Sequence, residues 1–203
     1  MSNLFRHFLT EDTDKLQYLK NHTIGKHRTA YFDYTASGLG FRPIENRVYD
    51  VLTTYANTHS KESSMANKTH TSYEEALISL KSSLALNDEF EVIPSGCGAT
   101  AAIKKLQELL GLYIPPATLH RFNITVAKKK LPLIIVGPYE HHSNEVSYRE
   151  ALCEVQRVNL NEEGLIDLKQ LKDILQENKH REIIGTFCVA SNVTGIVTPY
   201  EEI

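Results

Sequence analysis

Residues 131–144, which read LPLIIVGPYEHHSN, decide the fold of this chain. The apolar run at residues 131–136 predicts a buried strand, and Gly137 and Pro138 mark its end. A polar run, Glu-His-His-Ser-Asn at residues 140–144, follows directly. Ligands of parallel α/β sheets bind beyond the carboxyl ends of the strands, so this polar run is a candidate binding site.

The flanking sequence alternates between strand patterns and helix patterns. Further strands are predicted at residues 30–33, 89–93, 153–158 and 183–190. Helices are predicted from Pro43 onward, at residues 72–84 behind a Ser72–Glu75 capping box, at residues 100–110, and after Asp167. The polar stretch at residues 57–71 predicts a loop. We therefore expect an α/β fold with a mostly parallel sheet over residues 30–203. A polar lead-in precedes it at residues 1–29, with a helix near residues 13–20.

Composition and charge exclude several functional classes. The chain has 203 residues, 22 Lys+Arg against 25 Asp+Glu, and a net charge of −3. No nucleic-acid partner is expected, because a broad nucleic-acid surface needs an excess of basic residues. The sequence has no apolar run of membrane-spanning length and no secretory signal, so no membrane association is expected. Three scattered cysteines without disulfide or zinc spacing predict the cytoplasm.

A glycine-rich turn, Ser-Gly-Cys-Gly-Ala-Thr at residues 95–100, joins a predicted strand to a predicted helix. Gly96 and Gly98 allow a ligand to approach the backbone, the helix start favours an anion, and Thr100 adds a hydroxyl. The turn lacks the Gly-Lys-Ser/Thr of a P-loop, and no acidic residue completes a dinucleotide fingerprint. It predicts either a phosphate cradle or a tight strand–helix turn without a ligand.

Two other segments carry candidate chemistry. In residues 140–144, one imidazole is suited to stack on a planar cofactor or to move a proton. His141 and His142 point to opposite sides of an extended chain, so no metal site is expected. In Ser-Asn-Val-Thr-Gly at residues 191–195, Asn192 offers an amide donor, and an Asx or Ser turn is the alternative. A Cys97–His141 hydrolase is a weaker alternative, because no third residue orients the pair.

Together these segments resemble the class V aminotransferase family of pyridoxal-phosphate enzymes, which includes cysteine desulfurases and selenocysteine lyases. Residues 31–38, YFDYTASG, resemble the family's opening Tyr-Leu-Asp-Asn-Ala-Ala-x-Gly segment. Residues 97–101, CGATA, are similar to its Ser-Gly-Ala-Thr-Glu phosphate loop, with Cys97 and Ala101 as departures. EHHSN and SNVTG resemble its Glu-His-His-Ser/Ala-Asn and Ser-Asn-x-x-Gly motifs. The resemblance implies the first part of the large domain of fold type I.

The resemblance also implies a cofactor, pyridoxal 5′-phosphate, and a role for each matching residue. Gly98, Ala99 and Thr100 would hold its phosphate. His141 would stack on the pyridine ring, and Asn192 would bond its phenolic oxygen. Asn57 and His59 resemble the family's Asn-x-His stretch near the substrate. An amino acid would undergo transamination or desulfurase/lyase chemistry, and a complete version is expected to be a homodimer.

Two family residues have no counterpart in these 203 residues: the Schiff-base lysine and the acidic partner of the pyridine nitrogen. Lys68, Lys104 and Lys105 lack the preceding Ser-His pattern. We therefore expect an incomplete chain that is inactive alone, or a non-catalytic remnant that binds a phosphate ligand. The strand order of the family implies that, of the strands predicted here, only residues 131–136 and 153–158 are direct neighbours. The isolated chain would then be marginally stable or aggregated, or would need a second chain.

Overall fold

The structure, a computed structural model, describes residues 14–25 and 30–203. The chain divides into two compact units, of which the first ends at Ile93 and the second begins at Pro94. The predicted boundary after residue 29 adjoins residues 26–29, which lie outside the described part, and it stays a prediction. Within the described ranges, no helix combines the length and the apolar character needed to cross a membrane.

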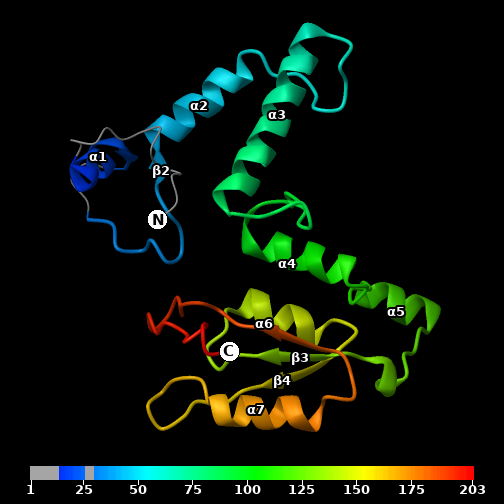
Figure 1. Cartoon of the computed structure of the whole chain (residues 1–203). Coiled ribbons are helices and arrows are strands. Elements are labelled where there is room, and N and C mark those ends of the chain that lie inside the picture. Colours follow the sequence, from blue (N-terminus) through cyan, green and yellow to red (C-terminus); the bar gives the residue numbers. More distant parts are fainter. Residues whose placement is uncertain (1–13, 26–29) are drawn as a thin grey trace. The chain divides into compact units, whose positions relative to one another are not determined.

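The first unit contains three helices and a short strand pair in its described residues. α1 (Lys15–His22) begins behind Asp14, whose carboxylate accepts the N–H groups of Leu16 and Gln17. β1 (Thr23–Ile24) pairs with β2 (Gly40–Phe41) in antiparallel orientation. α2 (Arg42–Leu52) and α3 (Ser64–Ser83) follow (Figure 1). The helices predicted near residues 13–20 and from Pro43 are confirmed in the described residues.

Three sequence predictions in this unit are wrong. Residues 30–33 form no strand, because the Tyr31 hydroxyl donates to the carbonyl of Ser37 at 2.6 Å and holds the segment in a turn. Part of the predicted loop at residues 57–71 is helical, since Ser63, not Ser72, caps α3 by accepting the Ala66 N–H at 3.1 Å. Residues 89–93 form no strand in the described structure.

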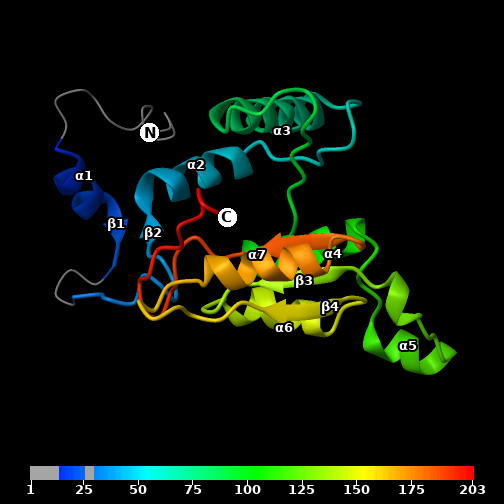
Figure 2. The same ribbon diagram turned by 60° about the horizontal axis from the view of Figure 1, so that its bottom comes forward.

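The second unit is a parallel sheet between two layers of helices, as the α/β prediction requires. β3 (Leu133–Val136) lies between β4 (Glu154–Arg157) and β5 (Ile183–Thr186). α7 (Leu168–Glu177) covers one face of the sheet, and α6 (His142–Arg149) covers the other (Figures 1 and 2). α4 (Gly98–Leu109) packs on α6, and α5 (Pro116–Phe122) and the 3₁₀ turn η2 (Lys128–Lys130) lead into β3.

The four residues of β3 supply the centre of both hydrophobic cores. Leu133 and Ile135 pack against the α7 side, whereas Ile134 and Val136 pack with Tyr148 of α6 on the opposite side. Successive side chains of a strand point to opposite faces, so a strand covered on both faces is apolar throughout. Burial of each such side chain contributes roughly 2 kcal/mol. The predicted buried strand is confirmed.

The expected strand pairing was too restrictive. β5 also pairs directly with β3, in a register that runs from Leu133↔Ile183 to Val136↔Thr186, so the expectation of a single neighbouring pair is wrong. β5 is also shorter than the predicted residues 183–190. It ends at Thr186 because the backbone N–H of Cys188 turns away from the sheet and donates to Glu140 Oε1 at 2.8 Å.

Candidate functional site

The loops that follow β3 and β5 lie beside each other at the carboxyl edge of the sheet. The two strands are parallel neighbours, so both chains leave the sheet on the same side. The hydrogen bond from Cys188 N–H to Glu140 Oε1 joins the two loops directly. The candidate segments at residues 140–144 and 191–195 therefore follow neighbouring strands on one edge.

His141 is the N-cap of α6. Its Nδ1 accepts the Ser143 N–H at 3.1 Å and lies 2.7 Å from Ser143 Oγ. Because Nδ1 is an acceptor here, the proton of the neutral ring is on Nε2. His141 is exposed, so the cap fixes the imidazole while its ring remains accessible. The expectation of an extended chain at this point is wrong, because residues 142–144 form the first turn of α6.

Asn192 lies in a turn that Ser191 organises. The Ser191 hydroxyl oxygen accepts the N–H groups of Val193 and Thr194 at 3.3 and 3.2 Å, and an isolated bridge joins Ala190 to Val197. The Ser-turn alternative thus describes the backbone of this segment. Asn192 itself is exposed, and none of the hydrogen bonds in the described residues uses its side chain.

The glycine-rich turn opens α4, whose first residues are Gly98, Ala99 and Thr100. Cys97 is the N-cap but makes no capping hydrogen bond with its side chain. Every other α-helix in the described ranges begins with a capping side chain or with a proline in its first turn. Gly98 has a φ of +74°, and a Cβ added there would meet open space. The start of α4 therefore has the room and the polarity that an anion requires.

α4 is fixed to α6 by a buried polar contact. The Gln107 side chain is fully buried, and its Nε2 donates to Ser147 Oγ of α6 at 2.8 Å. Within the described contacts, no hydrogen bond joins residues 97–100 to His141 or Asn192. The Cys97–His141 pair of the hydrolase alternative is thus not assembled in this structure.

Asn57 and His59 belong to the first unit and form a local turn. Asn57 Oδ1 accepts the N–H groups of His59 and Ser60 at 3.0 and 2.7 Å. Both residues are exposed. The turn gives a structural role to Asn57, and their part in substrate binding stays a prediction.

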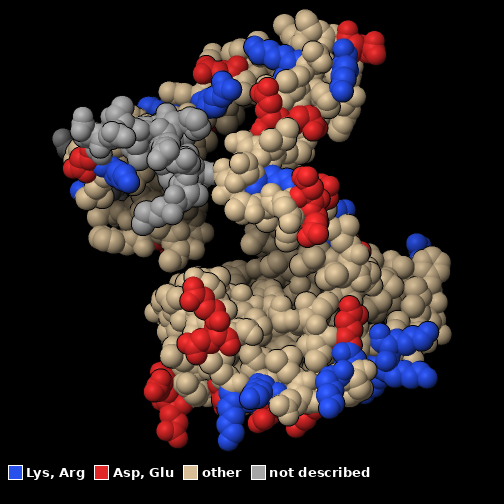
Figure 3. Space-filling view, viewed as in Figure 1, with Lys and Arg blue, Asp and Glu red and all other residues tan. Residues whose placement is uncertain are grey.

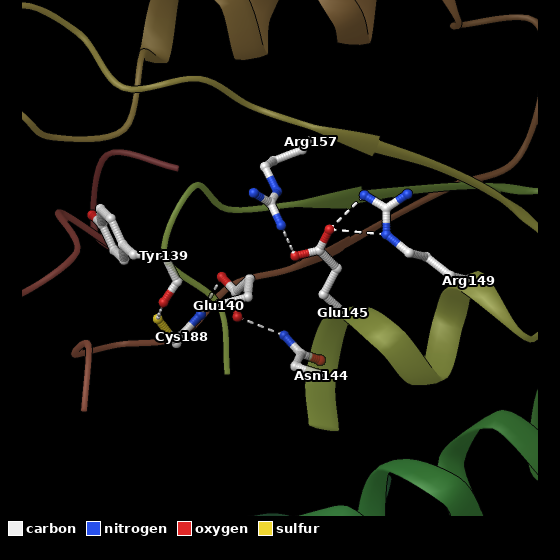
Figure 4. Close-up of polar contacts among 7 residues, drawn as sticks. All are labelled: Tyr139, Glu140, Asn144, Glu145, Arg149, Arg157 and Cys188. Atoms are coloured by element: carbon white, nitrogen blue, oxygen red, sulfur yellow. Dashed lines mark hydrogen bonds and ion pairs between the residues drawn. The ribbon is translucent and has the colours of Figure 1, made fainter. Parts of the chain in front are cut away.

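Sequence reasoning missed a polar chain that ties this edge of the sheet together. Glu140 Oε2 accepts Asn144 Nδ2 at 2.7 Å (Figure 4). Asn144 Oδ1 accepts the Thr186 hydroxyl at 2.8 Å. Glu140 and Asn144 lie in the motif that sequence analysis singled out. Only the pairing of β5 with β3 brings Thr186 and Cys188 to them.

A second missed cluster surrounds Glu145, which is 4% exposed. Its carboxylate pairs with Arg149 of α6 at 2.5 Å and with Arg157 at the end of β4 (Figure 4). Burial alone would raise the pKa of this carboxyl, but hydrogen bonds and charge from the two arginines outweigh burial and lower the pKa. The cluster clamps α6 onto the sheet.

A hollow of about 380 Å³ lies at the opposite edge, where the strands begin. The lysines of η2 line it, together with Glu154 and Arg181, and Figure 3 shows basic side chains gathered at this end, below α5. Arg181 donates to Glu154 Oε2 and to the Leu131 carbonyl, each at 2.5 Å. The hydrogen bond from Arg181 lowers the pKa of Glu154. This hollow is built around a structural ion pair and is separate from the candidate site.

The model of the family described as aminotransferase class V matches residues 30–203. The chain therefore belongs to the class V aminotransferase family, which confirms the resemblance seen in its motifs. It is also similar to a probable cysteine desulfurase of Chlamydia muridarum (strain MoPn / Nigg), with 32% identity over 74 residues. That match covers 34% of this chain and only 18% of the relative's length.

Class V aminotransferases and cysteine desulfurases depend on pyridoxal phosphate, and this family membership confirms the predicted cofactor class. The three-stranded parallel sheet with helices on both faces is consistent with part of a fold type I large domain. The open, uncapped start of α4 and the accessible His141 ring fit an anionic, planar cofactor. The individual cofactor contacts are proposals.

Proposed function

We propose that this chain binds pyridoxal 5′-phosphate at the carboxyl edge of its sheet and acts, as part of an enzyme, on an amino acid. The observation that carries this proposal is the start of α4, which has neither a capping side chain nor a proline. An anionic phosphate group would satisfy the positive end of this helix. Gly98, Ala99 and Thr100 would hold the phosphate, with the Thr100 hydroxyl as a side-chain donor.

His141 and Asn192 would hold the ring. The α6 cap holds the His141 imidazole by Nδ1, so its face is available for stacking. The exposed Asn192 amide would donate to the phenolic oxygen of the ring. When bound, the cofactor supplies an electron sink for bonds at the α-carbon of the amino acid. The residues of this chain bind and orient it.

The outcome would be transamination or desulfurase/lyase chemistry, with Asn57 and His59 on the substrate side. The similarity to a cysteine desulfurase supports the second outcome but covers only 34% of this chain. The protein would work as a homodimer in its complete form, by analogy with the family. A cytoplasmic location is supported by its cysteines, all three of which are free.

The two lysines of α4 make contacts with other side chains. Lys104 lies over the Tyr113 ring, and Lys105 pairs with Glu108 at 3.4 Å. We infer that the lysine the family uses is not among these 203 residues, so the chain would be inactive alone. The alternative is a non-catalytic protein of this fold that binds a phosphate ligand.

Cofactor binding tests the proposal directly. Fluorescence and absorbance titrations with pyridoxal 5′-phosphate should show binding to the wild-type chain, with inorganic phosphate as a competitor. Thr100→Ala should weaken binding about tenfold, because a charged phosphate oxygen loses one donor. Thr125→Ala removes an exposed hydroxyl outside the candidate site and is the matched control. Equal affinities of the two variants, or no binding by the wild type, would contradict the proposed site.

One measurement tests the inferred absence of the lysine, and another separates the enzyme from the non-catalytic alternative. Borohydride reduction with pyridoxal phosphate should give no stoichiometric adduct at any one lysine, and such an adduct would contradict the inferred absence of the lysine. If the enzyme hypothesis is correct, the genomic region beyond the codon for Ile203 should encode a predicted strand that ends in Asp and a Ser-x-His-Lys stretch. A stop codon confirmed there would favour the non-catalytic protein.

A further inference from the structure

Glu140 is the one carboxylate through which the loop after β3 contacts both α6 and the segment after β5 (Figure 4). Its Oε1 accepts the backbone N–H of Cys188 at 2.8 Å, and its Oε2 accepts Asn144 Nδ2 at 2.7 Å. Asn144 in turn accepts the hydroxyl of Thr186, the last residue of β5, at 2.8 Å. We call this chain of hydrogen bonds, from Cys188 through Glu140 and Asn144 to Thr186, the relay. Both of its ends lie at the carboxyl end of β5.

The Glu140 carboxylate packs against the backbone of Gly137. A Cβ added to Gly137 would lie 2.5 Å from Glu140 Oε1 and 3.5 Å from the Phe187 ring. The carboxylate therefore rests against the glycine backbone at the point where β3 ends. A side chain at residue 137 would displace it from the Cys188 N–H.

The segment held by Glu140 continues to Asn192. The Cys188 thiol donates to the Tyr139 carbonyl at 3.4 Å, so a second contact joins the same two loops. The Thr198 hydroxyl donates to the Cys188 carbonyl, and the Thr198 N–H donates to the Val189 carbonyl at 2.8 Å. These bonds join the two ends of the turn that carries Asn192. One of those ends is Cys188, which Glu140 binds.

We propose that Glu140 is a positioning residue that fixes His141 and Asn192 relative to each other. His141 is its neighbour in the chain, and Asn192 lies on the segment that its Oε1 anchors. Glu140 would not contact the cofactor. It would hold the ring-stacking side chain of His141 and the amide donor of Asn192 at a fixed distance from each other. The positioning role rests on the proposed function, but the hydrogen bonds of the relay can be tested without a cofactor.

The first experiment measures hydrogen exchange in the cofactor-free protein. In Glu140→Ala, the N–H of Cys188 loses its acceptor and should exchange at least about tenfold faster than in the wild type. The N–H groups of β3 report whether the fold persists. Glu150→Ala, at the exposed end of α6, is the matched control and should leave Cys188 unchanged. Unchanged protection of Cys188 in Glu140→Ala would overturn the proposal.

Glu140→Gln provides the conservative comparison. The glutamine oxygen can accept the Cys188 N–H, and a rotated Asn144 amide can accept the glutamine NH2 while donating to Thr186 Oγ1. This variant should therefore recover most of the Cys188 protection, and it supplies the test if Glu140→Ala does not fold. Loss of protection in the glutamine variant with an intact fold would show that the relay does not hold this loop as proposed.

The second experiment is a double-mutant cycle on pyridoxal-phosphate affinity. If Glu140 acts by placing Asn192, then Asn192→Ala should weaken binding about tenfold in the wild type and much less in Glu140→Ala. If Asn192→Ala weakens binding by the same factor in the wild type and in Glu140→Ala, the positioning role is overturned. Absence of binding by the wild type would instead refute the proposed function, and the exchange experiment would still decide whether the relay exists.

Discussion

At the scale of single residues, the stability of the site edge depends on a buried carboxylate. Glu145 pairs with Arg149 and Arg157, whose side chains are about half exposed. Its lowered pKa means that the folded state favours the charged form. Such a group contributes stability above its unfolded-state value of 4.5, and this contribution is lost as pH falls through the lower, folded-state pKa.

Glu145→Gln should destabilise the protein by about 2 kcal/mol at pH 7, because two guanidinium groups lose their charged partner. The cost lies below that of a fully buried pair, since water reaches both arginines. Urea unfolding at pH 7 and at successively lower pH should show the difference from wild type shrinking once pH falls below 4.5. Glu150→Gln, at the exposed C-cap of α6, should have little effect. A difference independent of pH would contradict the ionic role of Glu145.

At the scale of elements, the geometry before α4 depends on glycines in the left-handed region. Gly96 has a φ of +53°, and an added Cβ would lie 2.6 Å from Ala101 Cβ, whereas Gly98 has open space around it. Gly111, just beyond the other end of α4, has a similar φ of +69° and is equally open. A comparison of substitutions at Gly98 and Gly111 can therefore separate the effect of backbone strain from the effect of losing the phosphate cradle.

Gly98→Ala and Gly111→Ala should each cost roughly 1 kcal/mol, because alanine is strained at positive φ. Gly96→Ala should cost more, because it adds a clash with Ala101. Only substitutions at the start of α4 should weaken pyridoxal-phosphate binding, measured by titration beside denaturant unfolding. Equal loss of affinity in Gly111→Ala would show that general destabilisation, and not the cradle, controls binding.

At the scale of the whole molecule, many large apolar side chains remain exposed. Phe32 is 91% exposed, Val193 is 86% exposed, and Ile78 is 67% exposed. β4 and β5 are the outer strands of the three-stranded sheet in the described residues, so each offers an edge for further pairing. Large exposed apolar areas promote association or the binding of a partner.

The isolated 203-residue chain is therefore predicted to be marginally stable or to associate. Circular dichroism should show a broad thermal transition, and size-exclusion chromatography should show aggregates or a second bound chain. The dye ANS should bind the chain before it unfolds. A sharp, cooperative melt of a monomer would contradict this prediction.

The sequence by itself determined the fold class, the central strand and the family. These follow from local signals: an uninterrupted apolar run at residues 131–136, alternating strand and helix patterns, and four short motifs in order. The i, i+4 spacing of Glu145 and Arg149 is also visible in the sequence. Such signals are readable because helix and strand periodicity reflect burial against the rest of the chain.

Only the tertiary structure decided how the motifs are held. It paired β5 with β3, formed no strand at residues 89–93, and brought Arg157 to Glu145 and Cys188 to Glu140. These contacts join residues far apart in the chain, and their formation depends on which strands become neighbours. A polar side chain carries no local signal of a distant partner, so the relay around Glu140 appears only after the sheet is assembled.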